Sequence, residues 1–192
     1  MHFDIILPTI GRDSIHAAIG SVFAQTHTNW TLYIIGDKWP VPLETSWPNN
    51  VIPLYAEGSG DDSGAFARNC GILCSHAEWI AYIDDDDEWH PDHLATHVNI
   101  RDENSDVTMT RTAGQSFMMK HKHPRTSLLI RKMGAINTTD ILTVGMAHSR
   151  ELFDKTSGWQ PQDNHDKTLW NEMLAVGGEA VESEAVTYSF RR

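Results

Sequence analysis

The stretch "WIAYIDDDDEWHPDHL", residues 79–94, places a run of carboxylates directly after a segment that can form a buried strand. Four aspartates, Asp84 to Asp87, follow the apolar residues 79–83 without a break. Adjacent carboxylates repel one another, and each loses hydration beside an apolar core. The run therefore predicts a bound cation that removes this repulsion.

The spacing of the acid run indicates which cation it would bind. Extended residues alternate sides, so we expect Asp84 and Asp86 to face one point and Asp85 and Asp87 to face away from it. Two carboxylates aimed at one point suit a hard divalent cation, Mg²⁺ or Mn²⁺, shared with phosphate oxygens. A solvated acidic loop near the N-terminus of the next helix is the alternative. The position after a buried strand favours the metal site.

Length and charge limit the other functions. A chain of 192 residues with 40% hydrophobic and 21% charged residues suits one domain with a substantial core. The net charge of -11 makes DNA, RNA and anionic membranes poor partners. No apolar run approaches the roughly 18 residues that span a bilayer. Together with two cysteines, Cys70 and Cys74, these features predict a cytoplasmic protein without membrane insertion.

Alternating strands and helices predict an α/β fold with a Rossmann-like, largely parallel sheet and flanking helices. In the first half, we expect strands at 3–7, 31–35, 51–56 and 79–83, and helices at 12–25, 65–77 and 92–100. Pro53 favours an edge position or an early break for the third strand. In the second half, we expect strands at 106–112, 127–130, 141–147 and 185–190, and helices at 149–155 and 166–176.

Polar residues stand at the end of three predicted strands. Thr9 follows the first strand, Asp37 follows the second, and the acid run follows the fourth. Ligands of open α/β sheets bind beyond the carboxyl ends of the strands. The topology therefore predicts that these residues meet in one crevice.

A further carboxylate occurs in "QDNHDKTLWNEML", residues 162–174. Asp166 precedes Leu169 and Trp170 by three and four residues, so it shares the apolar face of a predicted helix. It either stabilises the first turn of that helix or acts as a catalyst in a cleft, and both roles remain open. His90, His93 and His97 are expected to be solvated or paired with nearby acids rather than to bind a metal.

Three segments together resemble the family 2 glycosyltransferases, which have the nucleotide-sugar-binding GT-A fold. They are "IILPTIGRDSIHAAIGSVFAQTHTNWTLYIIGD" (5–37), "ARNCGILCSHAEWIAYIDDDDEWHPDHL" (67–94) and "AHSRELFDKTSGWQPQDNHDKTLW" (147–170). The resemblance implies a single GT-A catalytic domain over 1–192, with a nucleotide-binding half at about 1–100 and an acceptor-binding half at about 101–192. It also implies an inverting transfer from a nucleotide-sugar donor, a UDP-sugar, to a saccharide or other hydroxyl acceptor.

The same resemblance assigns roles in donor binding. Asp37 would accept a hydrogen bond from the nucleotide base, and Pro8 and Thr9 would line the same pocket. Asp84 and Asp85 would contact the ribose or help to hold the metal. In addition to these residues, Arg68 would reach a phosphate or pair with an acid.

The chemistry of transfer is implied in the same way. Asp86, with help from Asp84, would be the main ligand of Mn²⁺ or Mg²⁺. Asp166 would be the general base. The basic cluster "KHKHPR" (120–125) would either close over the diphosphate, through Lys120, Lys122 or Arg125, or form a solvated loop.

The chain departs from the family pattern at three places. Ile10 and Gly11 replace the usual Tyr-Asn, so a stacking aromatic is missing unless Trp39 substitutes for it. One acid is lost beside Asp37. His165 replaces the Glu that usually precedes the base.

Other functions remain as alternatives. A sugar nucleotidyltransferase would require a Gly-rich basic loop after the first strand, and "LPTIGRD" (7–13) is not such a loop. A phosphatase with an aspartyl nucleophile would carry its acids after the first strand rather than the fourth. A non-catalytic module that binds a nucleotide-sugar or a divalent cation is compatible with the sequence, but it would give an inward-facing Asp166 no role.

Overall fold

The computed structural model describes residues 1–42, 44, 46–58, 64–116, 130–132, 141–162 and 164–190. The basic cluster at 120–125 and nearly all of the predicted strand at 127–130 lie outside the described residues.

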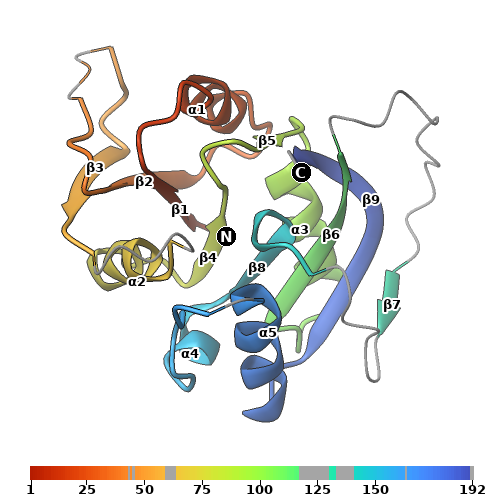
Figure 1. Ribbon diagram of the computed structural model, residues 1–192. Helices are drawn as coiled ribbons and strands as arrows, with labels where there is room; N and C mark the ends of the chain where they lie inside the picture. The colour runs from red at the N-terminus through yellow and green to blue at the C-terminus, as the bar shows by residue number, and fades with distance from the viewer. Residues whose placement is uncertain are drawn as a thin grey trace.

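The first half of the chain forms a parallel sheet, as predicted (Figure 1). Its strands are β1 (Phe3–Thr9), β2 (Trp30–Asp37), β3 (Val51–Ala56) and β4 (Trp79–Tyr82). They lie in the order β3-β2-β1-β4, so the strand that contains Pro53 is at the edge. Parallel neighbours require crossover connections, and α1 (Ile15–Phe23) and α2 (Ala65–Cys74) supply two of them.

The second half extends the same sheet with mixed strand directions. β8 (Met146–Ser149) pairs antiparallel with β4, and β6 (Met109–Ser116) pairs antiparallel with β8. The long β9 (Ala180–Phe190) runs parallel to β6. β5 (Glu88–Trp89) and β7 (Ile130–Lys132) pair antiparallel with β9. The described strands thus form one curled sheet within an α/β fold.

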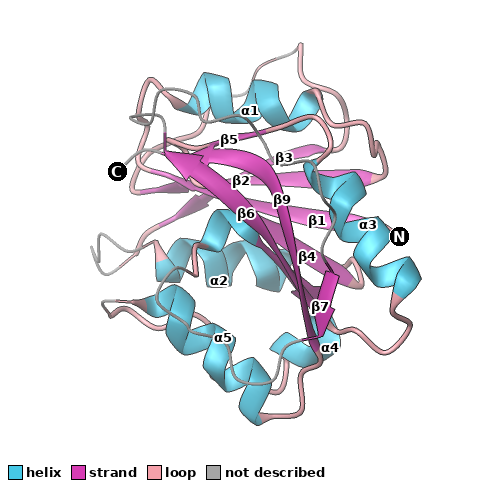
Figure 2. Cartoon of the chain, turned by 90° about the vertical axis from the view of Figure 1, so that its right-hand side faces the viewer, coloured by secondary structure: helices cyan, strands magenta, loops and turns pink. Residues whose placement is uncertain are grey.

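Helices cover both faces of the sheet, and each face has its own apolar core. Figure 2 shows α1 and α2 on opposite sides of the strands. α1 and α3 (His93–Glu103) pack on one face, where Ile5 and Leu7 of β1 point. α2, α4 (Arg150–Phe153) and α5 (His165–Ala175) pack on the other face, with Ile6. Burial on both faces explains why the first strand reads as a continuous apolar run.

A glycine allows α2 to approach the sheet closely. A Cβ atom at Gly71 would lie 2.6 Å from Cδ1 of Ile35 and 3.1 Å from Cγ2 of Ile6. A larger residue would push the helix away from the strands. The close contact fixes the preceding turn of α2, which carries Arg68, relative to the ends of β1 and β2.

One prediction of local structure was wrong, and one element was missed. The predicted strand at 141–147 is interrupted, because Thr143–Gly145 form the 3-10 helix η2 and β8 begins only at Met146. The side chain of Tyr188 lies where a Cβ atom of Gly145 would stand, 2.7 Å from its Cε1. β5 was not predicted, since two residues next to an acid run carry no strand pattern of their own. Both elements depend on contacts with the distant β9.

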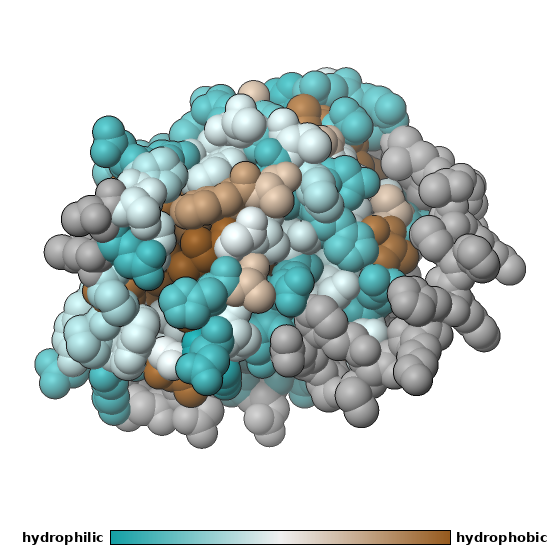
Figure 3. Space-filling model, turned by 90° about the horizontal axis from the view of Figure 1, so that it is seen from above, coloured by the Kyte–Doolittle hydropathy of each residue, from teal (hydrophilic) through white to brown (hydrophobic). Residues whose placement is uncertain are grey.

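The surface mixes hydrophilic side chains with small apolar groups, as the face in Figure 3 shows. The large hydrophobic side chains most exposed among the described residues are Ile10, Phe23, Tyr55, Phe66, Leu73 and Val176. Cys70 and Cys74 are free thiols. Within the described residues, none of the helices has the length and apolar character needed to cross a membrane.

Candidate functional site

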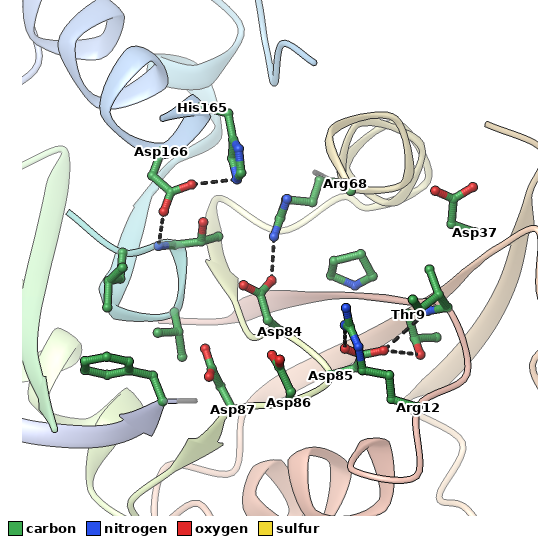
Figure 4. Close-up of a pocket in the computed structure, with 17 residues that line it drawn as sticks. Thr9, Arg12, Asp37, Arg68, Asp84, Asp85, Asp86, Asp87, His165 and Asp166 are labelled. Atoms are coloured by element: carbon green, nitrogen blue, oxygen red, sulfur yellow. Dashed lines mark hydrogen bonds and ion pairs between the residues drawn. The ribbon is translucent and has the colours of Figure 1, made fainter. Parts of the chain in front are cut away.

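A cavity of about 610 Å³ opens at the carboxyl ends of β1, β2 and β4 (Figure 4). Parallel strands point their carboxyl ends to the same edge, so segments far apart in sequence meet there. The wall contains the eight residues to which the sequence assigned donor binding, metal binding or catalysis within the described chain: Pro8, Thr9, Asp37, Arg68, Asp84, Asp85, Asp86 and Asp166. The structure therefore brings the whole predicted set together.

Burial alternates along the acid run, although all four aspartates contribute to the cavity wall. Asp84 and Asp86 are half-buried, whereas Asp85 and Asp87 are buried. Burial raises the pKa of Asp86, and the negative charge of Asp84 adds to the rise. Among the described residues, only the backbone N–H of Asp86 itself donates a hydrogen bond to this carboxylate. Asp86 is thus a carboxylate at the cavity with room for a ligand.

Asp85 has a different environment, since donors from the loop after β1 surround it. Thr9 Oγ1 donates to Oδ2 over 2.7 Å, and the backbone N–H of Ile10 reaches the same oxygen at 3.3 Å. Arg12 Nη1 donates to Oδ1 over 2.5 Å, and this hydrogen bond raises the pKa of Arg12. The sequence did not identify Arg12; its place just after the first strand was the available signal.

Gly11 and Trp39 are coupled at the edge of the cavity. Gly11 has a φ of 86°, and a Cβ atom there would lie 2.5 Å from Cε2 of Trp39. Trp39 packs against the core on the α1 side and does not line the cavity. In this structure Trp39 therefore does not take the place of the missing stacking aromatic, and Ile10 lies exposed at the wall instead.

Asp37 lies at the end of β2 with an unused acceptor. Its Oδ1 is buried and finds no hydrogen-bond partner among the described residues. A Cβ atom at Gly58 would come within 2.8 Å of this oxygen, so the glycine keeps the space open. A buried acceptor without a donor is costly, which favours a ligand that supplies an N–H group.

Arg68 connects α2 to the acid run. Its Nη2 donates to Oδ1 of Asp84 over 2.5 Å, so the acid is its partner here. Its guanidinium also lies 4.9 Å from the ring centroid of Trp159. The adjacent Asn69 holds the Trp159 backbone through bonds of 2.8 and 3.0 Å to its O and N. The Arg-Asn pair of the sequence thus fixes one side of the cavity.

Asp166 points into the cavity from the first turn of α5 (Figure 4). Its Oδ2 accepts a hydrogen bond of 3.1 Å from the backbone N–H of Thr143, and His165 Nε2 lies 2.6 Å from its Oδ1. Burial alone would raise the pKa of Asp166. The close contact with His165 and its charge, with the charge of Arg68, outweigh burial, so this pKa lies below the ordinary value. The carboxylate is therefore ionised at neutral pH.

The histidines of α3 lie away from this site. His93 and His97 are completely buried, and their Nδ1 atoms lie 2.7 Å from the hydroxyls of Thr187 and Thr110. The expectation of solvated or acid-paired rings was wrong for both, because the helix face that carries them packs on β6 and β9. Burial lowers the pKa of His97 to about 3. Neither ring lines the cavity.

The opposite wall was not foreseen from the sequence. Leu142, Thr143, Val144 and Phe190 come from η2 and from the end of β9. Within the described wall, two guanidinium groups, those of Arg12 and Arg68, face a larger set of carboxylates: Asp37, Asp84, Asp85, Asp86, Asp87 and Asp166. The cavity is therefore strongly negative and suits a ligand that arrives with a cation.

A family profile named "Glycosyl transferase family 2" matches residues 59–157, which is more than half of the chain. The chain belongs to glycosyl transferase family 2. Among its relatives in this family is WcaA of Escherichia coli (strain K12), a glycosyl transferase named for colanic acid biosynthesis. WcaA is 35% identical over 106 residues, which cover 49% of this chain and 36% of WcaA. The matched region spans about a third of the length of the first curated relatives.

Solved structures share the fold of this family 2 chain. S. aureus TarS 1-349 in complex with UDP-GlcNAc has a TM-score of 0.80 at 13% identity, covering 100% of this chain and 59% of TarS. The mannosyltransferase PcManGT from Pyrobaculum calidifontis, in complex with GDP-Man and Mn²⁺, has a TM-score of 0.68 at 13% identity, covering 100% and 56%. At this identity the likeness establishes the GT-A fold.

Proposed function

We propose that this chain is the catalytic part of an inverting glycosyltransferase. It would move a sugar from a nucleoside diphosphate, a UDP-sugar, to a hydroxyl of a saccharide or other acceptor. One observation carries the proposal: Asp37, the acid run and Asp166 line a single cavity. The UDP-GlcNAc complex of TarS, which shares the fold, supports the donor class.

The two halves of the chain would divide the substrates. Residues 1–100 supply the wall that carries Asp37 and the acid run, and residues 101–192 supply the wall that carries Asp166. Asp37 Oδ1, which lacks a described donor, would accept a base N–H beside Pro8 and Thr9. Asp84 would contact the ribose or help Asp86 to hold the metal. Asp85 would act mainly by holding Thr9 and Arg12 in place.

A divalent cation fits the acid run. The available donors are carboxylate oxygens, which suit Mg²⁺ or Mn²⁺. The described residues contain no group of three or more ligands suited to a metal. Asp86 and Asp84 would therefore hold the ion, with diphosphate oxygens and water completing its coordination. When bound, the cation would neutralise charge on the departing diphosphate. The Mn²⁺ in the PcManGT complex supports this choice.

Asp166 would act as the general base. Its carboxylate would take the proton from the acceptor hydroxyl while that oxygen forms a bond to the anomeric carbon. The bond between the anomeric carbon and the diphosphate oxygen would break, and its electron pair would leave with the diphosphate. Attack from the opposite face inverts the configuration. A positioned base contributes about 10²–10⁴-fold in rate.

Two alternatives from the sequence are less well supported by this geometry. A sugar nucleotidyltransferase must hold a triphosphate, but both guanidinium groups of the described wall are paired with aspartates. A non-catalytic binding module would leave an ionised carboxylate at Asp166 in the cavity without a role. The alternatives predict different products, so one set of assays separates them.

The experiment measures nucleoside diphosphate release from UDP- and GDP-sugars, with and without Mn²⁺ and acceptor saccharides. Transfer that requires Mn²⁺ and is lost in Asp166→Asn, with donor binding retained, supports the proposal. Pyrophosphate release from a nucleoside triphosphate and a sugar phosphate would indicate the nucleotidyltransferase. Donor binding without turnover under all conditions would indicate the binding module. Full transfer by Asp166→Asn would remove Asp166 from its role.

A further inference from the structure

The contact between His165 and Asp166 is specific enough to define a protonation pattern. His165 Nε2 lies 2.6 Å from Asp166 Oδ1, and His165 Nδ1 lies 3.3 Å from the backbone oxygen of Gln162. The backbone oxygen of Gln162 can only accept, and the Asp166 carboxylate can only accept when it is ionised. A bare ring nitrogen would repel a carboxylate oxygen at this distance, so the contact favours hydrogen on Nε2. It is an ion pair by distance and not an aligned hydrogen bond, because Oδ1 of Asp166 has no hydrogen-bond partner among the described residues. A ring with hydrogen on both nitrogens satisfies both contacts.

The surroundings restrict the pair to this arrangement. The His165 and Asp166 side chains retain 20% and 17% of their exposure, so the pair is partly shielded from water. The ring of Trp159 lies edge-on to His165 at 5.5 Å between centroids. The N–H of Thr143 holds the other carboxylate oxygen. Partial burial strengthens an ion pair relative to a fully exposed one.

Other charges also face this pair. Arg68 of α2 favours the ionised form of Asp166. The carboxylates of the acid run line the same cavity, and their negative charges oppose the ionisation of Asp166. On the same segment, Lys167 follows Asp166 and Asp163 precedes His165 in the sequence. Substitution of His165 alone leaves all of these charges in place, so its effect can be measured separately.

We propose that His165 is a positioning residue that pairs with Asp166, orients its carboxylate and keeps it ionised in the more acidic part of the working pH range. The catalytic consequence rests on the function proposed above, whereas the pairing is a property of the free protein. A glutamate at position 165, as is usual in the family, would place a second negative charge beside the base. His165 therefore extends base function to lower pH than Glu would allow.

The sign of the effect follows from charge. A positive or N–H-donating partner stabilises the ionised carboxylate and lowers the pKa of Asp166, and a negative partner raises it. The pKa of Asp166 should therefore increase in the order wild type, His165→Gln, His165→Glu. The acidic limb of the pH profile of kcat/KM reports protonation of the base in the free enzyme. This limb should therefore move to higher pH in the same order.

The test uses two measurements on these three proteins. Carboxyl ¹³C NMR follows the titration of Asp166 in the unliganded protein, with the signal assigned by its absence in Asp166→Asn. The pH profile of kcat/KM follows transfer. We expect the His165→Glu titration and acidic limb to lie on the order of 1 pH unit above wild type, with His165→Gln between them. His16→Gln, which changes an exposed histidine of α1, should leave both unchanged.

The outcomes separate this proposal from the proposed function. Coincident carboxyl titrations in wild type, His165→Gln and His165→Glu would overturn the pairing. An altered titration with full transfer by Asp166→Asn would retain the pairing and reject Asp166 as the base. A uniform fall in kcat with no shift of the limb would reduce His165 to a packing role. Thermal unfolding of each variant verifies that the fold is intact.

Discussion

Asp85 and Asp86 are adjacent in the sequence but differ in their surroundings. Asp85 is 1% exposed, and Thr9, Ile10 N–H and Arg12 donate to its oxygens. Asp86 is half-buried at the cavity, and its pKa is raised by burial and by Asp84. One carboxylate is satisfied by the protein, and the other is not.

The difference separates structural acids from acids that await a ligand. A buried carboxylate with several donors organises the loop that supplies them, so its loss should affect stability. A carboxylate at a cavity without donors costs stability until a cation or a substrate arrives. By this criterion Asp85 belongs to the scaffold, and we expect Asp86 to bind a ligand. Asp166 falls outside the criterion, because the Thr143 N–H donates to its carboxylate, and its proposed role rests on its position in the cavity.

The largest effect is expected at Asp166. Asp166→Asn removes the base but keeps the side-chain volume, so kcat should fall by about 10²–10⁴-fold while the donor Kd is unchanged. Steady-state transfer assays and donor titration calorimetry measure the two quantities. Glu172→Gln is the matched control, since Glu172 lies on the same helix and accepts a bond from the Ser157 N–H. Equal losses in the two variants would contradict the assignment.

Substitutions of Asp86 and Asp85 should differ in their effect on Mn²⁺-dependent donor binding. Mutation of a residue that only hydrogen-bonds to a metal ligand typically lowers metal affinity by about 10–100-fold. Loss of a ligand itself should therefore weaken Mn²⁺-dependent donor binding at least 10-fold. We expect this loss for Asp86→Asn in calorimetric titrations with and without Mn²⁺. If Asp85→Asn shows the larger loss while its stability is unchanged, the comparison between the two acids fails.

A substitution at Thr9 tests the structural role of Asp85 by removing one of its hydrogen-bond donors. Thr9→Val keeps the shape but removes a donor from the buried Asp85, which should lower the free energy of unfolding by about 1–3 kcal/mol. Urea unfolding measures the change. Thr28→Val, at an exposed position, should change stability much less. A similar result for both variants would show that the Asp85 cluster contributes little to the fold.

The buried histidine His97 extends the comparison to a neutral group in the core, where Nδ1 lies 2.7 Å from the Thr110 hydroxyl and Nε2 has no hydrogen-bond partner among the described residues. In the unfolded chain it binds a proton below about 6.5, whereas in the folded protein its pKa is about 3. Its contribution is therefore complete above about pH 6.5 and is lost as pH falls toward 3, with a slope of up to about 1.4 kcal/mol per pH unit. Urea unfolding at several pH values should show a shallower acid loss in His97→Gln. An unchanged slope would contradict this account.

The sequence predicts the parallel half of the fold well, because that half depends on local patterns. Apolar runs, helix spacing and strand-end polar residues placed Thr9, Asp37 and the acid run at one sheet edge. Alternation along the extended chain also predicted that Asp84 and Asp86 would differ in exposure from their neighbours.

The remaining features depend on contacts between distant segments. The Arg12–Asp85 pair joins residues 73 positions apart, and no periodic pattern records such a contact. The wall at Leu142–Val144 exists because Thr143 bonds to Asp166 and because Tyr188 fills the space beside Gly145. His93 and His97 looked like surface residues, since the partners that bury them lie on β6 and β9.

The contact between Gly11 and Trp39 has a consequence for redesign of the loop after β1. The indole of Trp39 occupies the volume into which any side chain at position 11 would project. Introducing the Tyr-Asn pair common in related enzymes would therefore require a smaller residue at 39 in the same step. Positions 11 and 39 should therefore be varied together, because libraries that vary them one at a time would miss the functional combinations.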